Sequence, residues 1–285
     1  MARSWGEVWE RVRLSLALGR AYDAGLMAAR NNDTGRFEQA RRALEQLSEQ
    51  AGARALRAQA PLSRAEEEVA SAIDWTNQAQ SPLHAGQQAQ LEQKAADSYR
   101  RALQISAQAG GEFSSSNPEL LNGLGYFLAD KGTSPEDFKR AERLAREALK
   151  LQDQEVSDAR QKAGEAGGAY LLARYSRANT RDSLAWAQFK QAASEPGARA
   201  ASLLEASRRE QQAALDEARH SLAELKALNL APPLSAELPY HLAMILRAQN
   251  ALAPAPARLA QAQSLLREAA ALQPDFAPAQ QALKP

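Results

Sequence analysis

The chain has 285 residues, enough for one elongated helical array or two small globular domains. Its 35 basic and 34 acidic residues leave a formal net charge of +1, so no global field recruits nucleic acid or an anionic membrane. Cysteine is absent, which excludes disulfides and thiolate metal sites and fits either a reducing or an oxidising compartment.

The residue types predict an all-α fold. Valine, isoleucine and threonine, which favour strands, are scarce throughout the chain. Alanine, leucine, glutamine, glutamate and arginine, which favour helices, dominate it. Proline and glycine then divide the chain into helices joined by short loops.

The first expected hairpin covers residues 4–58, with an apolar stripe at helical spacing through Val8, Val12 and Leu16. Trp5 and Trp9 lie one turn apart and fit either the packed start of this helix or an exposed docking patch. The apolar stretch in this region is too short for a signal peptide or a membrane helix. A cytoplasmic location is therefore the default expectation, and an exported form with its leader removed stays open.

The following hairpins are expected at residues 62–109 and 117–163. Ser63 and Glu66 suit a capping box at the start of the first of these. In the second, Asn117 suits an N-cap, and a Ser-Pro-Glu-Asp sequence from Ser134 restarts the chain as a helix. Two more hairpins are expected at 169–229 and 235–274, with a short closing helix at 276–283. Because single hairpins cannot bury their apolar faces, we expect all five to stack into one domain over residues 1–285.

The order of residues in these hairpins resembles the tetratricopeptide repeat family, whose roughly 34-residue helix pair carries a Leu-Gly pair and later small residues. The third hairpin matches best, with Leu124-Gly125 followed by Ala141, Ala145 and Ala148. The last hairpin also matches, with Leu242-Ala243 followed by Ala262, Leu266, Ala269 and Pro274. The resemblance implies a right-handed superhelical solenoid of about five antiparallel hairpins.

The spacing departs from the family pattern. The leucine and the later packing residue are roughly 20 residues apart in the family. Here 24 residues separate Leu124 from Ala148, and 41 separate Leu184 from Leu225. Insertions are therefore expected between the two helices of each unit. The largest, around residues 194–215, is expected to lengthen the eighth helix beyond the array.

In the family, partners bind in the concave groove that the first helix of each unit lines. The resemblance places nine residues of this chain there: Asn122, Tyr126, Asp182, Trp186, Phe189, Lys190, Tyr240, Met244 and Arg247. Aromatic side chains with a few amide and charged groups suit an extended peptide or a helix. As an alternative, Tyr126 and Trp186 pack between neighbouring hairpins.

No catalytic constellation is evident in the sequence, so we expect neither an enzyme nor a cofactor. The three histidines, His84, His220 and His241, are not spaced as metal ligands, and surface or core roles are expected for them. Arginine pairs such as Arg100-Arg101 and Arg208-Arg209 are interleaved with glutamates, which is typical of solvated helix faces rather than a nucleic-acid site.

The leading hypothesis is a protein–protein interaction scaffold or adaptor that binds a partner peptide or helix, without nucleic acid and without membrane insertion. The alternative is a structural subunit that self-associates into a homo-oligomer through Trp5 and Trp9 or through the long eighth helix. An enzyme or nucleic-acid binder that uses the irregular insertions is the third and least favoured class.

Overall fold

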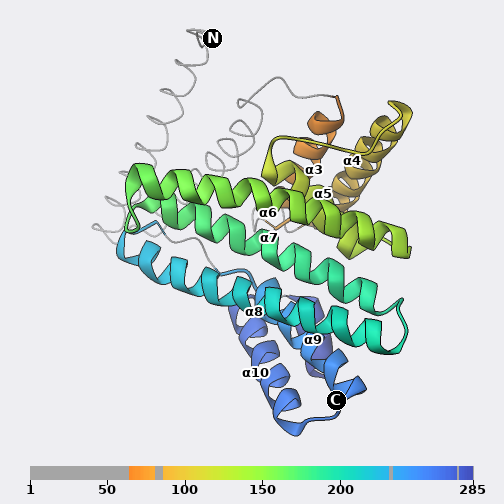
Figure 1. Cartoon of the computed structure of the whole chain (residues 1–285), viewed down its shortest axis with the longest axis vertical. Helices are drawn as coiled ribbons and strands as arrows, with labels where there is room; N and C mark the ends of the chain where they lie inside the picture. The colour runs from red at the N-terminus through yellow and green to blue at the C-terminus, as the bar shows by residue number, and fades with distance from the viewer. Residues whose placement is uncertain (1–63, 81–85, 231–233, 275, 285) are drawn as a thin grey trace. The chain divides into compact units, whose positions relative to one another are not determined.

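A computed structural model describes residues 64–80, 86–230, 234–274 and 276–284. In these ranges every regular element is a helix, which confirms the all-α expectation (Figure 1). The expected hairpin at 4–58, with Trp5 and Trp9, lies outside the described residues, as does His84. The described helices are α3 (Arg64–Gln80), α4 (Gln88–Gln108), α5 (Pro118–Lys131), α6 (Pro135–Ala163), α7 (Gly168–Ala192), α8 (Gly197–Ala227), α9 (Glu237–Leu252), α10 (Pro256–Leu272) and α11 (Ala277–Leu283).

Contacts divide the chain into two compact units, Met1–Phe113 and Ser114–Pro285. A single domain over the whole chain therefore stays a prediction. In the first unit α3 packs on α4, with Val69 and Ala102 fully buried. The Arg101 guanidinium on α4 donates a 3.0 Å hydrogen bond to Glu68 on α3. Helices α3 and α4 thus form a helix pair within the range 62–109, where a hairpin is expected.

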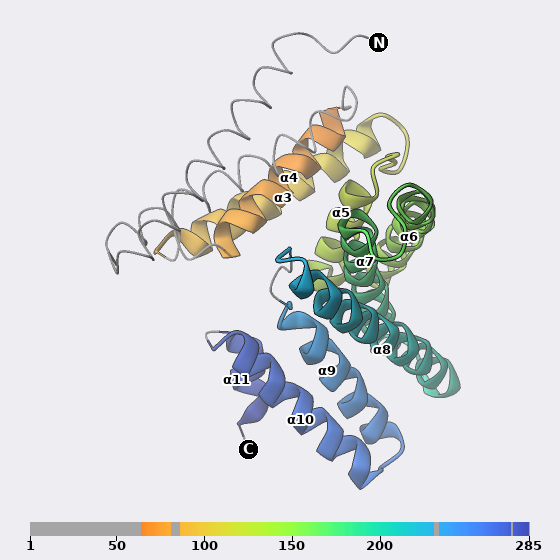
Figure 2. The same ribbon diagram turned by 90° about the vertical axis from the view of Figure 1, so that its left-hand side faces the viewer.

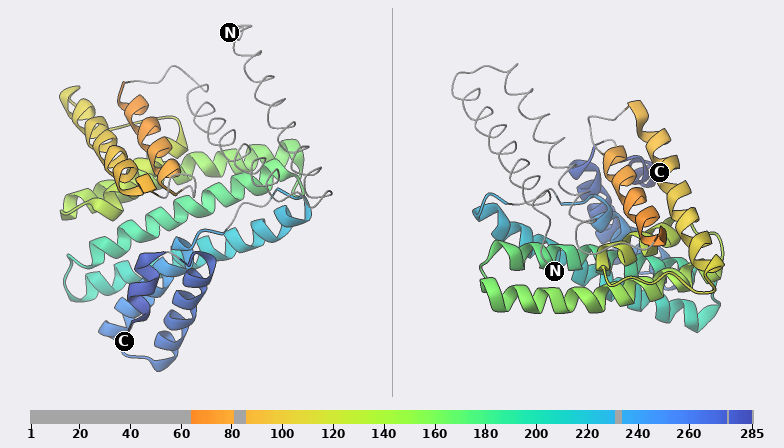
Figure 3. Two further views of the ribbon diagram at one scale, coloured as in Figure 1. Left: turned by 180° about the vertical axis from the view of Figure 1, so that it is seen from behind. Right: turned by 90° about the horizontal axis from the view of Figure 1, so that it is seen from above.

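The second unit, 114–285, consists of three helix pairs and the short helix α11. Each helix packs on the next one along the chain, and α7 also contacts both α5 and α9. The three longest helices, α6, α7 and α8, lie side by side (Figures 1 and 3). Helices α9 and α10 form the last hairpin, and α11 packs on α10 (Figure 2).

Local signals set the ends of α5 and α6, as expected from the sequence. The Asn117 side chain accepts a 2.9 Å hydrogen bond from the backbone N–H of Glu119. Ser134 and Asp137 form a capping box, in which each side chain accepts a 3.1 Å hydrogen bond from the backbone N–H of the other. Gly164 ends α6 with a φ of 71°, a left-handed conformation that favours glycine.

The small residues of this pair allow a close helix crossing. A Cβ atom on Gly125 of α5 would lie 3.3 Å from the carbonyl oxygen of Ala141 and 3.4 Å from the backbone nitrogen of Ala145. Ala141, Ala145 and Ala148 on α6 are all fully buried. Gly125 and the alanines therefore let α5 and α6 pack closely against each other.

The expectation for the insertion in the fourth hairpin was partly wrong. Helix α8 is long as expected, with 31 residues. It does not run free of its neighbours, however, because buried residues recur along its length from Ala200 to Leu225. The reason is that its partners are also long: α7 has 25 residues and α6 has 29, so α8 stays packed on α7 throughout.

Candidate functional site at the junction of α5, α7 and α9

The predicted groove residues lie on the three helices that contact one another in sequence, α5, α7 and α9. Contacts within one cluster connect six of the nine: Tyr126, Asp182, Trp186, Phe189, Lys190 and Tyr240. The residue at the centre of this cluster is His241, which was not among the candidates. We refer to these seven residues, together with Gln211 and Glu237, as the junction cluster.

A buried polar triad forms the middle of the junction cluster. His241 Nδ1 lies 2.8 Å from Asp182 Oδ1. The Gln211 amide on α8 donates to the same carboxylate oxygen at 2.5 Å and to the Leu238 carbonyl at 3.0 Å. The exposed fractions are only 5% for Asp182, 2% for His241 and 0% for Gln211. The triad therefore joins α7, α8 and α9 through polar groups that water hardly reaches.

Aromatic rings surround the triad. The Trp186 ring stacks on His241 with centroids 4.0 Å apart and on Phe189 with centroids 4.8 Å apart. Tyr240 lies 6.4 Å from Trp186, and the Lys190 ammonium lies 5.0 Å from the centroid of the Trp186 ring. Offset aromatic pairs and a cation over a tryptophan face are each favourable beyond the area that they bury.

A second polar contact joins α5 to α9. The Tyr126 hydroxyl donates a 2.9 Å hydrogen bond to Glu237 Oε1. Burial first, and the Glu237 charge second, raise the pKa of Tyr126 well above its usual value. Burial also raises the pKa of Glu237, although the charge of His241 acts in the opposite direction.

The surroundings of His241 favour its protonated form. Burial alone lowers the pKa of a histidine, but the carboxylates of Asp182, Glu237 and Asp130 outweigh it, and the pKa of His241 is raised. When His241 is protonated, its imidazolium donates to Asp182 and the two side chains form a buried ion pair. A raised folded-state pKa means that this pair stabilises the fold most at low pH and loses its contribution as the pH rises through that pKa.

In the described ranges the other three candidates make no hydrogen bond or ring contact with the junction cluster, although the charge of Arg247 acts on Tyr240. Arg247 donates a 2.8 Å hydrogen bond to the Ala282 carbonyl and so holds α11. Asn122 is half-buried, and its Oδ1 is buried without a hydrogen-bond partner. Met244 is half-buried on α9.

Burial distinguishes the roles of the clustered residues. Trp186 is 5% exposed and Asp182 is equally buried, so the structure favours packing between hairpins for both. Phe189, Lys190 and Tyr240 are half-buried, as is Tyr126, whose hydroxyl is bonded to Glu237.

Sequence reasoning missed three members of the junction cluster: Gln211, Glu237 and His241. A signal for His241 was present, because this polar residue follows Leu238 by three positions and precedes Ile245 by four, within an apolar stripe. His220, in contrast, is a surface residue whose ring pairs with Glu224 at 2.9 Å. Both histidines thus have the surface or core roles that were expected.

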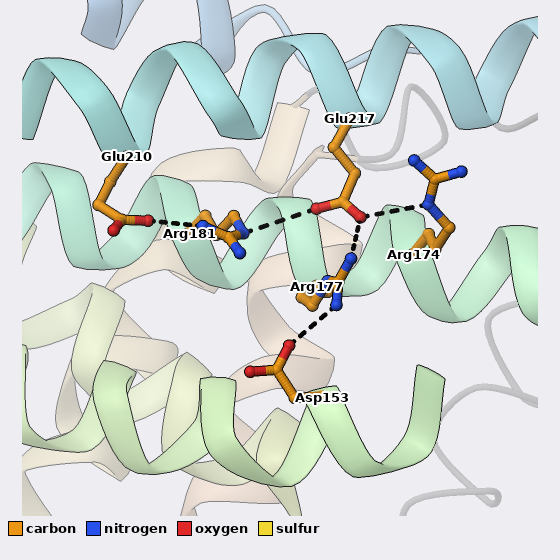
Figure 4. Close-up of polar contacts among 6 residues, drawn as sticks. All are labelled: Asp153, Arg174, Arg177, Arg181, Glu210 and Glu217. Carbon is orange, nitrogen blue, oxygen red and sulfur yellow. Dashed lines mark hydrogen bonds and ion pairs between the residues drawn. The ribbon is translucent and has the colours of Figure 1, made fainter. Parts of the chain in front are cut away.

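A different polar arrangement lies along α7, which we call the arginine ladder (Figure 4). Glu217 on α8 accepts from Arg177 at 2.5 Å and from Arg174 at 3.3 Å, and it lies 3.6 Å from Arg181. Arg181 also donates to Glu210 of α8 at 2.8 Å, and Arg177 to Asp153 of α6 at 2.9 Å. The ladder therefore connects the three long helices with three positive and three negative charges.

The described ranges contain neither a metal centre nor a membrane span. Nowhere in them do three or more histidine, aspartate or glutamate side chains gather as ligands for an ion. Each described helix is too short or too polar to cross a bilayer.

Comparison with known proteins gives little further information. No family model and no curated protein matches the chain. Among solved structures, a chain described as a DHF58 filament aligns with 96% of this chain and 98% of its own length, at 15% sequence identity and a TM-score of 0.34. That score is too low to support an argument about fold or function.

Proposed function

We propose that residues 114–285 form a tetratricopeptide-like solenoid that binds an extended peptide or a helix of another protein, and that the protein works as an adaptor rather than an enzyme. One observation carries the proposal: the first helices of three successive hairpins, α5, α7 and α9, contact one another in order. In tetratricopeptide-like arrays this row of helices is the face that takes the partner.

The partly exposed side chains of the row fit such a ligand. Phe189 and Tyr240 supply aromatic area, Met244 an adaptable apolar surface, and Lys190 a positive charge. Trp186 contacts Phe189, Tyr240 and Lys190 and so restricts their movement, and Trp186 itself stacks on His241 of the Asp182–His241 pair. A preorganised face loses less entropy when it binds. We therefore assign binding to the four surface residues and support to the buried ones.

Selection from a random-peptide library, followed by affinity measurement, tests the assignment. The substitutions Phe189→Ala and Met244→Ala, made together, are expected to weaken a selected peptide by at least about tenfold, the loss that a removed hot spot causes. Lys150→Ala, on an exposed position of α6, is the matched control and should leave the affinity unchanged. Equal binding by the double variant would show that this face is not the site.

Self-association is the second candidate function. Leu228 and Leu230, directly after α8, are 44% and 52% exposed, and Leu172 on α7 is 43% exposed. Leu228 and Leu230 both lie near Gly168 at the start of α7, so they form one apolar surface. Light scattering of the full chain tests this candidate: a larger mass that falls when both leucines are changed to serine supports it, whereas a monomer at all concentrations contradicts it.

A further inference from the structure

We propose that the Asp182–His241 pair is a proton-operated catch, which holds α9 against α7 at low pH and loosens as the pH rises. The proposal deepens the proposed function and rests on it in one respect, because the catch would control whether the row α5, α7, α9 is continuous. The catch itself is a property of the unliganded chain and can be tested without any partner.

The geometry makes the pair depend on its proton. His241 Nδ1 lies 2.8 Å from Asp182, and the pair is almost completely buried. When His241 is charged, it compensates the Asp182 carboxylate. When it is neutral, Asp182 keeps the Gln211 amide at 2.5 Å but loses the nearby positive charge. A buried carboxylate without a compensating cation is costly.

The carboxylates that face His241 from the packed helices act in the same direction, whereas the Lys190 ammonium does not. From α5 come Asp130 and the Tyr126 hydroxyl, which is bonded to Glu237. From α9 itself come Glu237 and Tyr240, and from α7 Asp182, with Lys190 located over the Trp186 ring. Three carboxylates therefore surround one imidazole, and loss of its proton leaves them to repel one another.

The sign of the effect follows from two shifted groups. The pKa of His241 is raised, so its stabilising contribution is complete below the ordinary histidine pKa of about 6.5 and is lost as the pH rises through the folded-state pKa. The pKa of Glu237 is raised as well, chiefly by burial, so this group also favours the closed state at lower pH. Its ordinary pKa of about 4.3 is lower than that of histidine, so its contribution begins to fall at a lower pH.

Opening of the catch does not require the last hairpin to unfold. Leu242 and Leu246 of α9 share an apolar core with Leu215 and Ala218 of α8 and with Leu266 of α10. These contacts carry no titratable group. Deprotonation of His241 therefore loosens the side of α9 that faces Asp182 and Trp186, while the apolar side stays packed.

Hydrogen exchange of the full chain between about pH 6 and pH 9 tests the catch, with rates corrected for the intrinsic pH dependence of exchange. In α9 the opening equilibrium constant is expected to rise by up to tenfold per pH unit between about 6.5 and the raised pKa, and then to level off, because one proton is released on opening. Helix α5 should change less than α9. No pH dependence in α9 over this range would overturn the proposal.

Histidine variants show whether His241 is the group that titrates. H241Q keeps a hydrogen-bond donor but no titratable proton, and should lose the dependence. The matched control is H84Q/H220Q, in which His241 is the single histidine left of three, and it should keep the full slope. Retention of the pH dependence in H241Q, together with its loss in H84Q/H220Q, would overturn the proposal.

A titration followed by NMR in the H84Q/H220Q variant gives a readout that does not depend on the folding of H241Q. The single imidazole signal should titrate above about 6.5, the ordinary histidine value. Adding Asp182→Asn, which keeps the shape of the side chain but not its charge, should lower that pKa. A signal at or below the ordinary value in H84Q/H220Q would overturn the catch, whereas failure of the peptide-binding test alone would overturn only the proposed function.

Discussion

The two sides of α7 hold their neighbours in different ways. On one side the arginine ladder connects α7 to α6 and α8, with arginine side chains that are 19% to 26% exposed around a Glu217 side chain that is 10% exposed. On the other side the Asp182–His241 pair and Trp186 connect α7 to α9, and their side chains are almost completely buried. One helix thus carries both a partly exposed charge network and an almost completely buried one.

We expect this difference in solvent exposure to determine how much the loss of one charge costs on each side of α7. A partly exposed charge that loses its partner is solvated by water instead, so removal of the partner costs little stability. A buried charge that loses its partner has no water to replace it, so breaking the pair costs about 3–5 kcal/mol. We therefore expect a graded response from the arginine ladder and a much sharper one from the junction cluster.

Asp182→Ala is expected to have the largest effect. It leaves a buried imidazolium and the Gln211 amide without their shared acceptor, so the opening free energy of α9 should fall by about 4 kcal/mol. Hydrogen exchange of α9 measures the change. Asp216→Ala is the matched control, because Asp216 is exposed on α8 and accepts only from Gln212, one turn away. A loss below 1 kcal/mol would show that the junction cluster does not respond more strongly than the arginine ladder.

Trp186→Ala comes next, with an expected loss of about 3 kcal/mol, the lower part of the range for a buried aromatic residue. The substitution removes the ring that stacks on both His241 and Phe189. The loss should appear in the exchange of α9 more than in that of α6, because α9 carries His241. An equal loss in α6 would mean that Trp186 supports the whole unit rather than this junction.

The all-α class and several helix ends could be predicted from sequence, because helix ends depend on local chemistry. Asn117, the Ser134–Asp137 capping box and Gly164 act within one turn of their own helices. The junction cluster could not be predicted in the same way. Asp182 and His241 are 59 positions apart, and their contact depends on the rotation of α7 against α9.

The arginine ladder shows the same limit. Arg174, Arg177 and Arg181 follow one another at spacings of three and four, a pattern that indicates one face of a helix. Whether that face meets water or the glutamates of another helix depends on packing. The repeat resemblance directed attention to α5, α7 and α9, but it did not indicate which of their side chains would be buried.

Glu217→Gln tests the arginine ladder and should lower the free energy of unfolding by about 2 kcal/mol. Glu217 is the common acceptor for the arginines of the ladder, and a glutamine keeps its shape without the charge. The cost should fall when the salt concentration rises from 0.1 M to about 1 M, since salt screens partly exposed pairs. The cost of Asp182→Ala should change less over the same range. Denaturation by urea at both salt concentrations gives the comparison, and an equal salt response from both variants would remove the distinction.

Arg219→Ala should have the smallest effect, below about 1 kcal/mol. Arg219 on α8 contacts both carboxylate oxygens of Glu268 on α10, at 2.5 and 2.6 Å, but the two side chains are 44% and 32% exposed. This pair joins α8 to the last hairpin with geometry as good as that of the junction, so it separates geometry from burial. If burial decides the energy, removal of Arg219 barely changes the exchange of α10, because water replaces the lost contact. A loss of 2 kcal/mol or more would show that contact geometry, and not burial, causes the energetic difference between the two sides of α7.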